Sequence, residues 1–160
     1  MKKVTTLIFI CLSFFLAHSI IYATPSALAN SPIGYWKTID DVTGKPKSIL
    51  KISQTGNGSL SGQIVKIFPR PGHDQNEVCT ACQGERHNKR IVGMVIMEGL
   101  KQNKDDPSEW NGGEILDPLN GKTYHCLIQV IDSGQKLRVR GYIGVPLFGR
   151  SQTWLRVEGL

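Results

Sequence analysis

The sequence lacks the motifs that mark the common enzyme classes. It has no Gly-x-Ser-x-Gly elbow for a serine hydrolase and no His-Glu-x-x-His segment for a zinc protease. Its paired glycines, Gly112-Gly113, lack the strand-loop-helix setting of a phosphate-binding loop. Glu114 and Asp117 lie three residues apart, with no third group that defines an acid–base pair. The sequence therefore predicts no catalytic residues, no cofactor and no metal, and it favours a non-enzymatic role.

Dense runs of one charge and long amphipathic helices are missing as well. The formal net charge is +6, but the basic residues are scattered among acidic ones, so we expect no nucleic-acid partner. No stretch of about ten or more residues has a convincing helical period. Short alternating segments fill the chain instead, separated by turn signals drawn from 17 glycines and 8 prolines. This pattern predicts an all-β barrel or sandwich of antiparallel strands.

The first 29 residues have the layout of a secretory signal peptide. Lys2 and Lys3 precede an apolar run over residues 4–21, and Ala27-Leu28-Ala29 offers a cleavage site, with Ala23 as an earlier alternative. A retained membrane anchor is the competing interpretation, because the run is nearly long enough to span a bilayer. We expect cleavage, export to the periplasm or the medium of a bacterial cell, and no stable membrane anchor afterwards. Residues 30–160 then form a single domain.

Eight segments of the remaining chain are predicted to be strands. They are residues 33–39, 48–53, 60–68, 91–97, 110–116, 123–131, 137–144 and 150–157. Eight antiparallel strands can close into a barrel, which removes exposed sheet edges. The interior of such a barrel is nearly filled by side chains or holds one small ligand. Residues 69–90 form a polar connection of about 20 residues, a length that is usually functional, cross-linked or mobile.

The first and last strands of the predicted barrel carry a recognisable pair of residues. Gly34-x-Trp36 on the first strand, with Arg156 on the last, resembles the lipocalin (calycin) pattern, in which a tryptophan near the N-terminus packs under a basic residue of the final strand. A guanidinium stacks on an indole face while its edge donates to nearby carbonyl groups. We therefore expect Gly34, Trp36 and Arg156 to close the barrel.

A wider set of motifs resembles the bacterial domain-of-unknown-function family 2147, DUF2147, over nearly the whole chain that follows the signal-like segment, from about Gly34 to Arg156. The set comprises Gly34-x-Trp36, Asp40-x-x-x-Gly44-Lys45, the Cys79-x-x-Cys82 loop, Ile91-Val92-Gly93, Trp110-x-Gly112-Gly113-x-Ile115-x-Asp117-Pro118, Asn120-Gly121-Lys122-x-Tyr124, Leu137-x-Val139-Arg140-Gly141-Tyr142-Ile143-Gly144 and Gly149-Arg150-x-Gln152-x-Trp154-x-Arg156. The resemblance implies a small exported protein with a lipocalin-like barrel. It implies no particular activity.

Three cysteines follow the signal-like segment. Cys79 and Cys82 have the spacing of a disulfide that stiffens a loop, of half a zinc site completed by His73 or His87, or of a redox pair. The disulfide is favoured, because the pair lies in a polar loop without a βαβ pattern and an exported chain meets an oxidising compartment. Cys126 shares a strand face with apolar residues, which predicts a buried core thiol.

Five residues are candidates for ligand binding: Glu114, Asp117, Arg140, Tyr142 and Gln152. Arg140 and Tyr142 alternate with an aliphatic face along residues 137–144. If the aliphatic face is the core, the arginines of this strand make surface ion pairs. If the polar face looks inward, Arg140 with an acid or Gln152 binds an anionic or polar ligand.

Three hypotheses of function follow. The first is an exported, non-enzymatic barrel that binds a small molecule or an envelope partner. The second is a structural protein that stabilises the envelope and whose barrel is filled, for example by Trp36, Phe68, Met94 and Tyr142. The third is a small redox or metal-dependent enzyme that uses the Cys79–Cys82 loop. The sequence predicts no oligomeric state.

Overall fold

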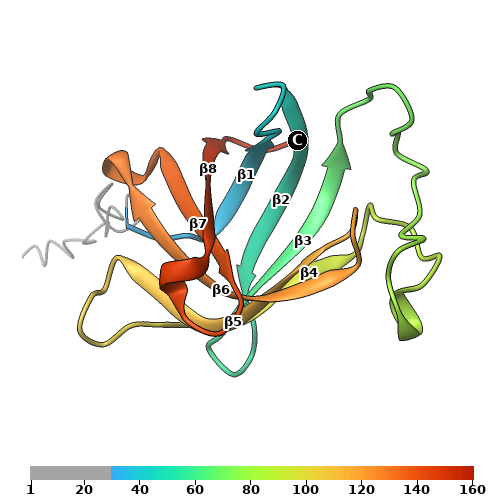
Figure 1. The fold of residues 1–160 in the computed structure, drawn as a ribbon. Helices are drawn as coiled ribbons and strands as arrows, with labels where there is room; N and C mark the ends of the chain where they lie inside the picture. Colours follow the sequence, from blue (N-terminus) through green and yellow to red (C-terminus); the bar gives the residue numbers. More distant parts are fainter. Residues whose placement is uncertain (1–29) are drawn as a thin grey trace, which may run out of the picture.

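The computed structural model describes residues 30–160, which form a closed barrel of eight antiparallel strands in sequential order (Figure 1). The strands are β1 Gly34–Ile39, β2 Pro46–Gln54, β3 Leu60–Ile67, β4 Val95–Gln102, β5 Glu109–Asp117, β6 Lys122–Ile131, β7 Lys136–Tyr142 and β8 Arg150–Val157. Three 3-10 turns complete the elements: η1 Gly84–Arg86, η2 Asp132–Gly134 and η3 Pro146–Phe148. The predicted all-β, eight-stranded antiparallel barrel is confirmed. The predicted signal peptide, residues 1–29, lies outside the described residues.

No helix within residues 30–160 has the length and the apolar composition needed to cross a membrane.

The barrel closes where β1 meets β8. The two strands pair over three residues, with Trp36 opposite Arg156. The guanidinium carbon of Arg156 lies 4.2 Å from the centre of the Trp36 ring. Its nitrogens donate to the carbonyl oxygens of Ser31, Ile33 and Gly134 at 2.5, 3.0 and 2.5 Å. Arg156 therefore ties β8 to the segment before β1 and to the β6–β7 turn.

Trp36 is fully buried beneath this arginine, and its Nε1 donates to the carbonyl oxygen of Pro32 at 2.7 Å. Gly34 leaves room for the arginine, because a Cβ built at this glycine would lie 2.9 Å from Nη1 of Arg156. Its φ of +134° is also one that side-chain-bearing residues rarely adopt. Gly34, Trp36 and Arg156 thus form one packed unit at the seam.

The core fills one end of the barrel. Strand alternation sends every second side chain inward. The fully or nearly fully buried apolar residues at this end are Trp36, Ile52, Leu60, Met97, Leu100, Trp110, Cys126, Ile128 and Leu137. Cys126 is 0% exposed, and burial raises the pKa of its thiol to about 12. It lies opposite Gly113 and serves as a small core side chain.

Two strand predictions need correction. The segment predicted as a strand at 91–97 starts pairing only at Val95, because Gly93 has a φ of +94° and Met94 turns back to donate to the carbonyl oxygen of Ile91. Strict alternation along the predicted strand at 60–68 would place Ile67 on the opposite face from Ile64. A register shift in the β2–β3 ladder, where Leu50 faces Ile64 and Ile49 faces Lys66, leaves Val65 as an extra residue and brings Ile67 to the inner side.

Candidate ligand-binding site

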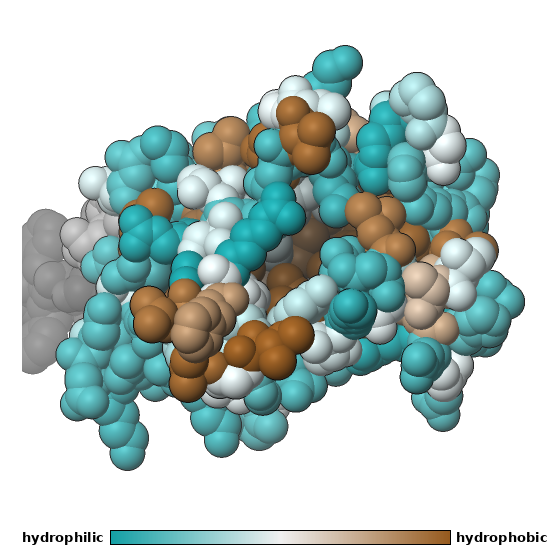
Figure 2. Space-filling view, viewed as in Figure 1, coloured by the Kyte–Doolittle hydropathy of each residue, from teal (hydrophilic) through white to brown (hydrophobic). Residues whose placement is uncertain are grey.

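The other end of the barrel is hollow. A cavity of about 480 Å³ opens there, and Figure 2 shows the opening with hydrophobic residues in its depth. Its deep wall is aliphatic and aromatic, and consists of Leu50, Ile64, Ile67, Ile96, Leu116, Val139 and Trp154. The barrel is therefore packed at one end and open at the other, which differs from the filled barrel of the second hypothesis.

The cavity also contacts polar side chains. Those that can carry charge are Lys47, Arg70, Glu77, Asp117 and Arg150, and the neutral ones include Thr38, Ser48, Asn120, Tyr124, Tyr142 and Gln152. Two connections at this end carry several of them: Arg70 and Glu77 lie in the β3–β4 loop, and Asn120 lies in the β5–β6 turn. Thr38 and Ser48 are buried and share a hydrogen bond of 2.8 Å between their hydroxyl oxygens. Apolar walls with a small number of polar groups are typical of small-molecule sites.

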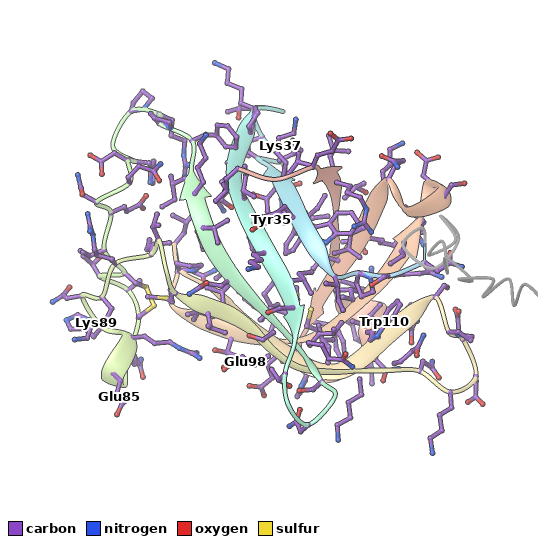
Figure 3. The ribbon with its side chains drawn as sticks, turned by 180° about the vertical axis from the view of Figure 1, so that it is seen from behind. Tyr35, Lys37, Glu85, Lys89, Glu98 and Trp110 are labelled. Carbon is purple, nitrogen blue, oxygen red and sulfur yellow. A yellow bond between two sulfur atoms is a disulfide. The ribbon has the colours of Figure 1, made fainter. Side chains whose placement is uncertain are left out.

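The long β3–β4 loop, residues 68–94, forms one side of the cavity and is held by the Cys79–Cys82 disulfide. Sγ of Cys79 lies 3.2 Å from the carbonyl oxygen of Pro118 in the β5–β6 turn. Arg86 of the same loop donates to Glu98 on β4 at 2.7 Å. Figure 3 shows the disulfide on this loop, with Glu85 and Lys89 directed away from the barrel. The predicted structural disulfide is confirmed.

The two histidines that the metal alternative requires have other partners at this loop. Both sulfurs are bonded to each other, His73 Nδ1 lies 2.8 Å from a Glu77 oxygen, and His87 Nδ1 lies 2.9 Å from the carbonyl oxygen of Cys82. In the part of the chain that the structure describes, no three His, Cys, Asp or Glu side chains gather into a cluster that could hold a metal ion.

Replacing Cys79 and Cys82 by serine is expected to loosen the loop and leave the barrel folded. The disulfide closes a very short ring, so the loss in unfolding free energy should be about 2 kcal/mol or less. Hydrogen exchange should accelerate in residues 78–92 and remain slow in β6 and β7. Wild-type protein treated with a reductant is the control and should behave like the variant. Equal acceleration in β6 and β7 would contradict a local role.

Three of the five predicted ligand-binding residues line the cavity. Asp117, Tyr142 and Gln152 are in its wall, whereas Glu114 and Arg140 are not. Val139 and Leu137 are buried and face inward, so Arg138 and Arg140 project outward from β7. The aliphatic face of this strand is the core face, as in the first of the two orientations considered above.

Arg140 organises the β7–β8 loop from the outer side. Its Nε donates to the carbonyl oxygen of Pro146 at 2.7 Å, and its Nη2 donates to that of Leu147 at 3.1 Å. Its Nη1 donates to the hydroxyl of Ser151 at 2.8 Å. Arg140 thereby shapes the loop beside the opening without reaching the cavity. Glu114 is exposed and lines a separate, smaller hollow with His125 and Tyr142.

Gln152 is already engaged within the cavity wall. Its Nε2 donates to Oδ2 of Asp41 at 2.6 Å, and Arg150 donates to the same oxygen at 2.6 Å. Nε1 of Trp154 donates to Oε1 of Gln152 at 3.3 Å. The Asp41–Gln152–Arg150 cluster therefore connects the β1–β2 turn to β8 at the cavity.

Sequence reasoning missed Arg70 and Lys47. Arg70 lies in Pro69-Arg70-Pro71-Gly72, which was interpreted only as the start of a long polar loop. Its Nη1 is buried and has no hydrogen-bond partner among residues 30–160. An arginine between two prolines is a weak sequence signal, and it gains meaning only once the loop is placed against the barrel.

Comparisons with known proteins agree with this fold. Residues 34–156 match the family described as an uncharacterized protein conserved in bacteria, DUF2147. A similar solved structure is that of protein HP1028 from the human pathogen Helicobacter pylori, which belongs to the lipocalin family. It is 19% identical, with a TM-score of 0.67 over 80% of this chain and 84% of that chain. No curated protein matches the sequence. The likeness shows a shared lipocalin-like barrel.

Proposed function

The chain belongs to the DUF2147 family, and we propose that its barrel binds one small, largely apolar molecule in the open-ended cavity. The cavity itself supports this proposal. Its volume of about 480 Å³ lies within the range of about 300–1,000 Å³ that is common for small-molecule sites. Lipocalin-type barrels of eight strands are wide enough to hold one such ligand.

The chemistry of the cavity favours an apolar body and a polar end. Leu50, Ile64 and Val139 present aliphatic surface that would remove a ligand's apolar area from water, at about 25 cal/mol per Å². Protein interiors contain few voids larger than a water molecule. An aliphatic hollow of this size therefore favours occupation by a ligand over a purely structural barrel.

We propose further that the protein acts after export from a bacterial cell, on the basis of the signal-like residues 1–29. An envelope partner is the second candidate. It is favoured by the four exposed apolar side chains of the β7–β8 loop, which are Ile143, Val145, Leu147 and Phe148. Figure 2 shows hydrophobic residues gathered beside the opening.

Filling the cavity from Gly141 tests the proposal. A Cβ at this position would meet Tyr124 and Ile115 at 3.6 and 3.8 Å, which are ordinary contacts within the cavity wall. Gly141→Leu is therefore expected to fold and to occupy the space of a ligand, and Gly141→Ala is the matched control. We expect the neutral dye phenylnaphthylamine to bind wild type and the alanine variant equally, and the leucine variant about tenfold more weakly or worse, a loss of about 1.4 kcal/mol or more.

Fluorescence titration measures these affinities, and circular dichroism checks that both variants fold. Absence of dye binding to wild type would contradict the proposal. So would equal binding by the leucine and alanine variants.

A further inference from the structure

We propose that the ligand of this cavity carries an anionic head group, which Arg70 binds with help from Lys47 while the apolar part of the ligand fills the barrel. This inference rests on the proposed function and specifies its ligand class. Its first support is Nη1 of Arg70, a buried charged donor without a hydrogen-bond partner in residues 30–160. A buried donor left unpaired is costly, so native structures normally provide a partner. Arg70 also lines the cavity, so a ligand toward which its guanidinium turns can supply this partner.

The acidic side chains around the cavity are already engaged. Glu77 lies 2.8 Å from His73, and Asp117 accepts hydrogen bonds from the Leu119 amide and the Asn120 side chain, both at 3.0 Å. These contacts keep both carboxylates on partners within their own loops. Neither forms an ion pair with Arg70.

The cationic side chains divide into two groups. Arg150 is paired with Asp41 at 2.6 Å. Arg70 and Lys47 make no ion pair within 4.0 Å among the described residues, although both line the cavity. The cavity thus offers two cations that make no ion pair, and two carboxylates whose contacts lie within their own loops. The two cations without an ion-pair partner are therefore the groups that can bind an anionic ligand.

The two free cations lie at the same edge of the barrel. The carbonyl oxygen of Lys47 accepts a hydrogen bond of 3.0 Å from the amide of Phe68, which lies two residues before Arg70. The backbone of Arg70 is itself fixed, since its amide donates to His73 at 3.1 Å and its carbonyl oxygen accepts from the His73 amide at 2.9 Å. The guanidinium at its end presents a planar pair of donors that matches a carboxylate or a phosphate.

The depth of the cavity defines the rest of the ligand. Beyond the charged edge the wall is formed by Leu50, Ile64, Ile96 and Val139, which offer no charge and no hydrogen-bonding side chain. A fully ionic ligand would leave this surface unused. The arrangement therefore fits a single-chain amphiphile with an anionic head, either a carboxylate or a phosphate monoester.

Competition against bound phenylnaphthylamine tests this inference. The competitors are laurate, dodecyl phosphate and dodecanol, which share one alkyl chain length and differ in head group, each used below its critical micelle concentration. Wild type is expected to bind at least one of the anions about tenfold or more tightly than dodecanol, as a charge-assisted hydrogen bond warrants. Arg70→Met should remove this preference and leave dodecanol binding unchanged.

Arg138→Met is the matched control, because Arg138 is exposed on the outer side of β7 and donates to Gln129 at 3.2 Å. It makes the same change in charge away from the cavity and should keep the preference for the anion. Arg70→Lys keeps the positive charge and should retain part of the preference, even if the methionine variant folds poorly.

The outcomes separate the two proposals. If phenylnaphthylamine and dodecanol both fail to bind wild type, the proposed function is wrong and this inference falls with it. If they bind but neither anion binds more tightly than dodecanol, only the anionic head group is refuted. The inference is also overturned if Arg138→Met weakens anion binding as much as Arg70→Met does. A preference retained in full by Arg70→Met overturns it as well.

Discussion

Trp36→Ala is expected to lower the free energy of unfolding by about 3–5 kcal/mol, as for other large aromatic truncations in a core. The side chain is fully buried, and its removal leaves a void beneath Arg156. It also removes the indole donor to Pro32 and the ring on which the guanidinium lies. β1 and β8 pair over three residues, and Trp36 lies opposite Arg156 within this short ladder. The melting temperature should fall by about 10 °C or more.

Tyr35→Ala is the matched control for that measurement. Tyr35 precedes Trp36 on the same strand, points to the outer side of β1 and lies against Lys51, whose Nζ is 5.8 Å from the ring centre (Figure 3). Truncating this half-buried aromatic should cost about 1 kcal/mol or less. Equal destabilisation by the two variants would show that Trp36 has no special role in closing the barrel.

Gly121→Ala is expected to destabilise by about 2–5 kcal/mol for two reasons that act together. Gly121 has a φ of +70°, which costs a residue with a Cβ about 1–2 kcal/mol. A Cβ there would also overlap the carbonyl group of Ala81, at 2.5 Å from its carbon. Ala81 lies between the two bonded cysteines, so the backbone has little freedom to withdraw. Overpacking of this kind typically lowers the free energy of unfolding by a further amount of about 1–3 kcal/mol.

Gly44→Ala separates these two causes. Gly44 has nearly the same φ, +68°, but a Cβ at this position would meet no atom within 4 Å. The control therefore measures backbone strain alone, and chemical denaturation of both variants gives the difference due to the clash. Gly121→Ala should in addition accelerate hydrogen exchange in residues 78–92, because it pushes the disulfide loop away from the β5–β6 turn. If the two alanine variants lose equal stability, the close packing at Ala81 has no energetic weight.

The turn at Gly121 also shows how far a local pattern can be interpreted. Asn120-Gly121 between alternating segments predicts a hairpin, and the hairpin of β5 and β6 is present. The connection runs from Pro118 to Gly121. Of Asn120 and Gly121, only Gly121 has a positive φ. Local sequence indicated the reversal, while the contact with Ala81 that makes the glycine necessary comes from a segment 40 residues earlier.

The candidate site was less accessible to prediction than the barrel. Asp117, Tyr142 and Gln152 belong to segments whose alternation could be interpreted, and they line the cavity. Arg140 alternates in the same way, but the direction of its face depends on which side of β7 is buried. Arg70 lies outside any alternating pattern, so only the folded β3–β4 loop reveals that it reaches the cavity.

The sequence alone determined the number of strands, the main turns and the pairing of Trp36 with Arg156. Period-two alternation and the placement of glycine and proline are local signals, and the Trp36–Arg156 pair is part of a family pattern that can be compared directly. Tertiary structure decides the hollow half of the barrel, the outward direction of Arg140, and the burial of Nη1 of Arg70 without a hydrogen-bond partner among residues 30–160. The hollow and Arg70 depend on a register shift and on a long loop packing against a distant turn, and Arg140 depends on which face of β7 is buried. None of these is encoded in the spacing of neighbouring residues.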